Sequence, residues 1–196
     1  MILIERGNMN IGLLKKVNVD SETWMSDMEL KRLNGFHFEN RKREFIGVRQ
    51  LRNQLCPSES IINEPNGKPI FTSNSLQLSV SHSKESVCLG ISKKPIGLDL
   101  EGIDARILRV KDKFVNEDEM TLYPIDSQED LTILWTIKES AYKLCNIKGL
   151  SFKNDIIAYY RSNNEHKCMI RTSKGEKKIT LFHERFDNEI LTYNFT

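Results

Sequence analysis

The segment 127–147 has the strongest helical pattern in the sequence, and it limits the folds that the chain can adopt. In SQEDLTILWTIKESAYKLCNI apolar residues recur at helical spacing, with Pro124 before the segment and Gly149 after it. A proline before an apolar stripe and a glycine after it mark the ends of a helix. The tail that follows, 155–195, has the pattern of three or four antiparallel strands. This half of the chain therefore predicts a helix packed on a small sheet.

The N-terminal half predicts a second set of elements of the same kind. Strands are expected at 2–5, 11–17, 76–80 and 86–92. We also expect a helix capped by Asp20 or Ser21 and a longer basic helix at 39–55. The sequence KKP at 93–95 indicates a seam. We expect an α+β fold with two similar lobes, 1–95 and 96–196, each a helix packed on a small, mostly antiparallel sheet.

Composition excludes several classes of protein. A net charge of +2 is too small to indicate a nucleic-acid partner. No apolar run has the length of a membrane span, and the N-terminus lacks the pattern of a signal peptide. The four cysteines are isolated from one another, and the four histidines show no zinc spacing. We expect a reduced, cytoplasmic protein without zinc.

The stretch IGLDLE at 96–101 alternates strictly and predicts a strand with one buried face. Asp99 and Glu101 leave the same face, with origins roughly 6–7 Å apart at the usual rise of a strand. Two like charges this close repel each other unless positive charge lies between them. Either the face is solvated or it forms part of a site for a divalent cation, and the stretch alone leaves both open.

Glu139 in the long helix offers a third carboxylate. It shares a stripe with Trp135 and Tyr142, which favours an inward direction, although it also lies four residues before Lys143 and could form an ordinary helix ion pair. Together with Asp99 and Glu101, it would complete an oxygen site of the kind that suits Mg²⁺ and substrate phosphates. The neighbouring Lys138 and Lys143 would then meet phosphate charge.

Asn116 and Glu119 form a plausible capping pair for a helix at 117–123. Two other short features each have an ordinary structural interpretation beside a functional one. The sequence NGKP at 66–69 is a common tight turn, and it lacks the flanking residues of a P-loop. The sequence SVSHS at 79–83 places Ser81 and His82 at the end of a strand.

In their order along the chain, NGKPIF, SVSHS, GLDLE and LWTIKESAYK resemble the motifs of the 4'-phosphopantetheinyl transferases. The resemblance extends from about residue 41 to residue 152 and includes KGLSF after the long helix. The length resembles the larger, single-chain type of that family. This implies two similar lobes, an active site in the cleft between them, and a monomer.

The resemblance implies transfer of phosphopantetheine from coenzyme A to a serine of an acyl or peptidyl carrier protein, with release of 3',5'-ADP. It implies that Asp99, Glu101 and Glu139 hold Mg²⁺, that Glu139 also takes the serine proton, and that Lys143 stabilises phosphate charge. It further implies that the 3'-phosphate side of coenzyme A is bound by Arg43, Lys68, Ser81 and His82. Gly97 is expected to leave room for the ligand beside the strand.

Carrier proteins served by this family are usually acidic, so a basic surface should meet them. The helix at 41–52 is expected to present Arg41, Lys42, Arg43, Arg49 and Arg52. The sequence leaves open whether the carrier belongs to fatty-acid, polyketide or peptide synthesis. Two alternatives remain open, a metal-dependent nuclease and a non-catalytic module that binds a cation.

Overall fold

Contacts within the chain divide it into two units, Met1–Lys94 and Pro95–Thr196. The structure is a computed structural model, and it describes residues 1–15, 17, 24–73, 75–123 and 125–195. The predicted helix cap at Asp20 or Ser21 lies outside the described residues. Each unit contains a long helix and an antiparallel sheet.

The first unit is built on a four-stranded sheet in the order β1-β2-β6-β5. Its strands are β1 (Ile2–Arg6), β2 (Met9–Lys15), β5 (Gln77–His82) and β6 (Ser86–Ser92). All neighbouring strands in this sheet pair antiparallel. A separate hairpin is formed by β3 (Ile61–Asn63) and β4 (Pro69–Phe71).

Among the described residues of the first unit, two helices accompany the strands, α1 (Asp27–Asn34) and α2 (Glu39–Leu55). α2 packs on β2 and β6, and its Val48 and Leu51 lie in one core with Leu89. α1 begins with a capping box, in which the side chain of Ser26 accepts the backbone N–H of Glu29 and the carboxylate of Glu29 accepts that of Ser26. The predicted strands and the basic helix of this half are thus present.

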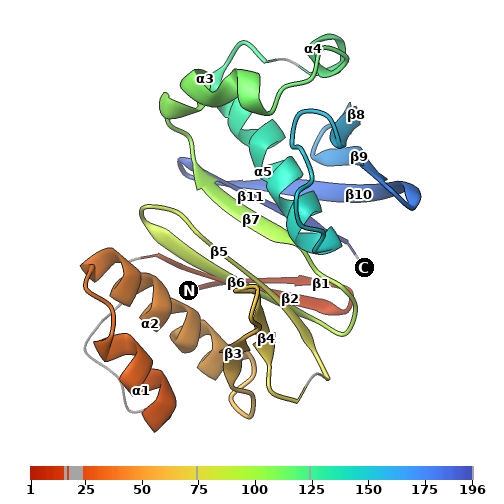
Figure 1. Cartoon of the computed structure of the whole chain (residues 1–196). Coiled ribbons are helices and arrows are strands. Elements are labelled where there is room, and N and C mark those ends of the chain that lie inside the picture. The colour runs from red at the N-terminus through yellow and green to blue at the C-terminus, as the bar shows by residue number, and fades with distance from the viewer. Residues whose placement is uncertain (16, 18–23, 74, 124, 196) are drawn as a thin grey trace. The chain divides into compact units, whose positions relative to one another are not determined.

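The second unit is built on a five-stranded sheet in the order β7-β11-β10-β9-β8. The strands are β7 (Leu98–Gly102), β8 (Ile156–Ser162), β9 (Glu165–Thr172), β10 (Gly175–Phe186) and β11 (Glu189–Asn194). The long helix α5 (Gln128–Cys145) lies along this sheet, as Figure 1 shows. Three short helices precede it, α3 (Arg106–Val110), the 3₁₀ turn η1 (Lys111–Lys113) and α4 (Glu119–Leu122).

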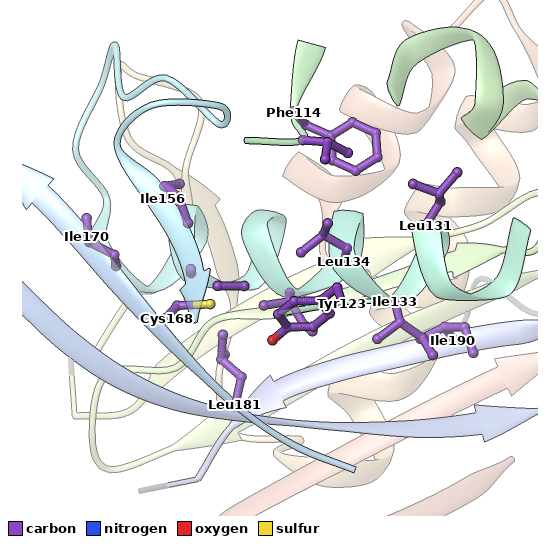
Figure 2. Packing of buried hydrophobic residues seen from close by; sticks show 14 residues of the cluster. Phe114, Tyr123, Leu131, Ile133, Leu134, Ile156, Cys168, Ile170, Leu181 and Ile190 are labelled. Carbon is purple, nitrogen blue, oxygen red and sulfur yellow. The ribbon is translucent and has the colours of Figure 1, made fainter. Parts of the chain in front are cut away.

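α5 starts and ends on local signals. The hydroxyl of Ser127 accepts the backbone N–H of Asp130 at 3.0 Å, and the helix ends at Asn146, which is left-handed with φ 51°. The predicted end at Gly149 is therefore three residues late. The apolar side of α5 packs with strand residues in one core, which includes Leu134, Leu181 and Ile190. Figure 2 shows part of this packing, with Ile133 of α5 beside Ile190.

The α+β class with helices on antiparallel sheets is confirmed. All four cysteines are free thiols. Among the described residues, no helix is both long enough and apolar enough to cross a membrane.

Candidate active site

Asp99 and Glu101 lie on β7 and both contact side chains of α5. Nζ of Lys143 donates to Oδ1 of Asp99 at 2.7 Å, and Nε1 of Trp135 donates to Oε1 of Glu101 at 3.4 Å. Asp99 is buried and Glu101 is partly buried. The two carboxylates therefore share the face that meets α5, and the alternative of a solvated strand face does not fit the structure.

Gly97 explains how α5 comes so close to β7. A Cβ built on Gly97 would lie 2.2 Å from the carbonyl oxygen of Ser140 and 2.6 Å from the backbone nitrogen of Leu144. Real Cβ atoms do not approach backbone atoms this closely. The prediction that Gly97 leaves room for a ligand is corrected, because the backbone of α5 occupies that space.

Glu139 completes a cluster of three interacting carboxylates with Asp99 and Glu101. Burial raises the pKa of Glu139 to about 7, and the charges of Asp99 and Glu101 act in the same direction while Lys143 opposes them. Burial, followed by the charge of Asp99, likewise raises the pKa of Glu101 to about 7. Both carboxyl groups therefore hold their protons to a higher pH than usual, because burial and the neighbouring carboxylates disfavour further negative charge where β7 meets α5.

The three carboxylates are of the ligand type that suits a magnesium ion, but they are not spaced to hold one in this structure. Carboxylate oxygens are hard ligands, and Mg²⁺ is commonly bound through one or two of them together with water and substrate phosphates. Within the part of the chain that the structure describes, no group of three or more His, Cys, Asp and Glu side chains is close enough to hold a metal ion. The observed arrangement is looser, with Lys143 supplying positive charge to Asp99.

Lys138, the other predicted phosphate-binding lysine of α5, has a different place. Its side chain is fully buried, and Nζ donates to the carbonyl oxygens of Phe114 and Phe152 and to the carboxylate of Glu119, at 2.6, 2.7 and 2.7 Å. An ammonium group has three protons, and all three are used. Lys138 is therefore withdrawn as a coenzyme A contact, since burial separates it from any ligand in solvent.

In the first unit, a pocket of about 460 Å³ lies beside the predicted nucleotide-binding residues. Arg41 and His82 line it, as do Gly67 and Pro69 on either side of Lys68. Nε2 of His82 lies 3.3 Å from the carboxylate of Glu44. The pocket also has the aromatic side chains Phe36 and Phe45 in its lining. It thus combines cationic and aromatic groups, which suits a charged aromatic ligand.

The other predicted residues of this region lie nearby in the fold. Ser81 and His82 are the last two residues of β5, as expected from SVSHS, and Ser81 is buried. Arg43 donates to the carbonyl oxygen of Lys84 in the turn that follows β5. The NGKP turn joins β3 to β4, with Gly67 at φ +92° and the backbone N–H of Lys68 bonded to the side chain of Asn66 at 2.8 Å.

Two of the five basic residues expected on the surface of α2 point inward. Arg49 and Arg52 are buried and pair with the carboxylate of Glu29 at 3.2 and 3.1 Å. Arg49 also lies over the ring of Phe45 at 3.7 Å. The predicted basic surface is therefore corrected to Arg41, Lys42 and Arg43, because the other two arginines compensate a buried carboxylate.

Sequence reasoning missed a second pocket, of about 300 Å³, next to Glu101. Trp135 and Thr132 of α5 line it together with Arg106, Ile107 and Val110 of α3. α3 has only five residues, so no helical period announces it in the sequence. The pocket opens directly beside a carboxylate of the cluster, where a substrate could approach.

The protein thus has an α+β fold. Its candidate site consists of three carboxylates and a lysine, and it lies where β7, which follows Gly97, meets the long helix α5. The family model of the 4'-phosphopantetheinyl transferase superfamily matches residues 95–193, half of the chain. The chain belongs to this superfamily.

Individual relatives agree with this family. The chain is 29% identical to the 4'-phosphopantetheinyl transferase gsp of Aneurinibacillus migulanus over 151 residues, covering 71% of this chain and 62% of the relative. It is 34% identical over 123 residues to the 4'-phosphopantetheinyl transferase psf-1 of Bacillus pumilus, covering 57% and 52%. A 4'-phosphopantetheinyl transferase of Bacillus subtilis is 23% identical over 168 residues, covering 74% and 75%.

The matched part of the chain thus spans less than two thirds of the length of the first two relatives. The matches give no support to the nuclease or to the non-catalytic cation-binding module.

Proposed function

We propose that the protein transfers 4'-phosphopantetheine from coenzyme A to a serine of an acyl or peptidyl carrier protein. The observation that carries the proposal is the carboxylate cluster with Lys143, which lies within the residues matched by the family model. The serine oxygen attacks the β-phosphorus of coenzyme A, and the bond from that phosphorus to the bridging oxygen of the pyrophosphate breaks. Phosphopantetheine remains on the carrier, and 3',5'-ADP leaves with the bridging oxygen.

Glu139 takes the proton of the serine hydroxyl in this proposal. A general base needs a pKa near the working pH, and the pKa of Glu139 is raised to about 7 by burial and by the charge of Asp99. Without a bound cation, the carboxylate is basic enough to accept the proton and is ionised in a large fraction of molecules near neutral pH, and a cation at the site would increase that fraction. Lys143 stabilises the charge on the transferred phosphate, for which a lysine serves as a compact positive group.

Asp99, Glu101 and Glu139 would hold Mg²⁺, with the roles of ligand and base shared at Glu139. When bound, the ion supplies positive charge against the pyrophosphate, which matters because phosphoryl transfer depends on positioning and charge neutralisation. Lys143 contacts Asp99 at 2.7 Å. Asp99 would therefore bring together the lysine and the ion that binds the pyrophosphate.

We assign the 3'-phosphate and adenosine side of coenzyme A to Arg43, Lys68, Ser81 and His82. The pocket in the first unit supports this assignment, because His82 lines it and the NGKP turn lies at its edge. The division into a coenzyme A lobe at 1–95 and a metal lobe at 96–196, a monomeric state and a cytoplasmic location remain predictions, as does an active site between the lobes.

Intact-mass spectrometry of apo-carrier proteins tests the function. Each carrier is incubated with coenzyme A and the protein, with Mg²⁺ or with excess chelator. We expect the carrier mass to rise by one phosphopantetheine group in the presence of Mg²⁺, and Asp99→Asn to abolish the change. The proposal fails if no acyl or peptidyl carrier is modified, and the metal assignment fails if the chelator has no effect.

A further inference from the structure

The buried ion pair between Lys138 and Glu119 ties together segments that are far apart in the sequence. Nζ of Lys138 donates to the main-chain carbonyls of Phe114 and Phe152. Phe114 precedes α4, and Phe152 lies in the segment between α5 and β8. The ammonium group of Lys138 on α5 thus binds one main-chain carbonyl in each of these two segments.

Glu119 extends the same network on its other side. Its Oε2 accepts the backbone N–H of Asn116 at 2.7 Å as well as Lys138, and its Oε1 accepts the backbone N–H of Ala158 at 2.8 Å. Both side chains are fully buried. A buried pair whose hydrogen bonds are all satisfied holds its surroundings rigidly. It is also costly to break, because loss of either partner leaves a buried charge without compensation.

The two residues held by their carbonyls both place their rings against Trp135. The ring of Phe114 meets the indole edge-on at a centroid distance of 5.2 Å, and the ring of Phe152 stacks on it at 5.3 Å. Figure 2 shows Phe114 beside α5, close to Leu134. Lys138 lies one helical turn after Trp135, so lysine and indole are on one side of α5. The spacing of W-x-x-K therefore places the ammonium next to the residues that enclose the indole.

The indole in turn contacts the carboxylate cluster. Nε1 of Trp135 donates to Oε1 of Glu101, and both residues line the pocket of the second unit. We propose that the Lys138–Glu119 pair is a positioning device that fixes Phe114 and Phe152, and through them Trp135, so that Glu101 is held in place for the reaction. This inference rests on the proposed transferase function, but its structural part does not depend on activity.

Fluorescence of Trp135 reads the structural part directly. The chain has two tryptophans, so a Trp24→Phe background reports Trp135 alone. Lys138→Met and the double variant Lys138→Met/Glu119→Gln remove the ion pair, and the double variant leaves no buried charge unpaired. We expect emission at longer wavelength, because loosened phenylalanine rings admit water to the indole.

Kinetics read the functional part. We expect the same variants to lower kcat about 10- to 100-fold, the usual effect of removing groups that orient a ligand, with little change in KM for coenzyme A. Phe152→Leu should reproduce both effects while its carbonyl still accepts from Lys138. The control is Thr136→Val, which removes a buried hydrogen bond to Thr192 from the same helix, and it should change neither emission nor kcat.

Folded ion-pair variants with wild-type emission and kcat overturn the proposal, and so does a Thr136→Val variant that behaves in the same way as they do. If both ion-pair variants fail to fold, Phe152→Leu decides, and wild-type behaviour there overturns it. A protein that modifies no carrier but shows the emission shifts contradicts the transferase function while supporting the positioning of Trp135.

Discussion

Glu139 lies partly buried on α5, and burial together with the charge of Asp99 raises its pKa to about 7. Its ionised form is therefore unfavourable for the fold near neutral pH, whereas the proposed reaction requires it. We expect Glu139→Gln to lower kcat by about 100-fold or more. The melting temperature without Mg²⁺ should stay the same or rise, because a repelled charge has been removed.

The matched control for this substitution is Glu129→Gln in the first turn of the same helix. Glu129 pairs with Arg185 at 2.6 Å at the surface, and exposed pairs contribute little to stability. Turnover and melting temperature should both stay close to wild type. Near-normal turnover in Glu139→Gln would contradict its assignment as base and ligand.

At the scale of single residues, the sequence predicts the cluster but not the role of every charge in it. Asp99 and Glu101 were predicted to share a face because strands have a period of two. Lys138 was predicted to bind phosphate, and this was wrong because the spacing of residues on a helix does not show which other segments pack against them. Its partners at Phe114, Glu119 and Phe152 come from separate segments, and only the tertiary fold brings them together.

The contact between β7 and α5 depends on the absence of a side chain at Gly97. We expect Gly97→Ala to be destabilised by at least about 1–3 kcal/mol, the usual cost of overpacking, because its Cβ would meet the backbone of α5 at 2.2 Å. It should also lose turnover, since moving α5 separates Glu139 from Asp99. Urea unfolding and carrier modification measure the two effects.

Gly102→Ala is the matched control, because Gly102 ends the same strand and a Cβ there has no neighbour closer than 4.0 Å. It should keep its stability within about 0.5 kcal/mol of wild type, as surface substitutions usually do. Equal losses in the two variants would show that the strand, and not the approach of α5, requires glycine.

A pair of histidines on β9 and β10 forms a buried element of a different kind. Nε2 of His166 lies 2.8 Å from Nδ1 of His183, and Nδ1 of His166 lies 3.3 Å from the hydroxyl of Tyr123, which donates to the carbonyl of Tyr160. This chain of bonds is satisfied when both rings are neutral and each carries its proton on Nδ1.

The pair should make stability depend on pH. Burial, then the charges of His183 and Arg161, lowers the pKa of His166 to about 3, and burial and Arg161 lower the pKa of His183. The unfolded chain binds protons below about pH 6.5 while the folded chain does not. Stability is therefore complete above pH 6.5 and falls as the pH drops, by up to about 1.4 kcal/mol per pH unit for His166, with a contribution of the same sign from the half-buried His183.

Urea unfolding at pH 7 and pH 5 measures this effect, with His166→Gln losing part of the difference. Among nearby charges, Glu129 and Asp130 on α5 favour the protonated form of His183 and Arg161 opposes it. His37→Gln at an exposed position of the first unit serves as control and should leave the difference unchanged. An unchanged pH dependence in His166→Gln would contradict the assignment.

At the scale of elements, long periodic segments were predictable and short ones were not. α2 and α5 follow from apolar spacing. Asn116 and Glu119 are in contact, because the backbone N–H of Asn116 donates to Oε2 of Glu119, but the predicted cap is wrong: α4 begins at Glu119 with Asp118 as its N-cap. α3, with five residues, has too few turns for a pattern, so the pocket that it forms beside Glu101 was missed. The capping box at Ser26 was also missed, although serine followed three residues later by glutamate is its usual sequence signal.

For the molecule as a whole, a net charge of +2 leaves the carrier to be met by local charge. With Arg49 and Arg52 turned inward, the remaining basic groups of α2 are Arg41, Lys42 and Arg43. We expect KM for an acidic carrier to rise with salt, since screening weakens the steering of encounter. Lys42→Glu should raise KM more than Lys178→Glu on β10, which changes the net charge equally. A KM independent of salt would favour apolar docking.

The assignment of coenzyme A to the first unit depends on Lys68 and His82, each of which could serve only a turn or a strand end. If they bind the 3'-phosphate, they act far from the reacting pyrophosphate, in substrate and transition state alike. Lys68→Ala and His82→Ala should therefore raise KM for coenzyme A more than they lower kcat. Dephospho-coenzyme A lacks the 3'-phosphate, so wild type should use it less efficiently and both variants should lose that preference.

Two exposed residues of the same unit, Lys31 and His37, provide the matched controls for charge and side-chain type. Lys31→Ala and His37→Ala should keep the full preference for coenzyme A over its dephospho form, because neither residue belongs to the NGKP turn or lines the pocket beside His82. If Lys68→Ala and His82→Ala also keep the preference for coenzyme A, then Lys68 and His82 have only a structural role, in the turn and at the strand end. The 3'-phosphate must then be bound by other cationic side chains, for which Arg41 in the lining of the same pocket is the next residue to replace.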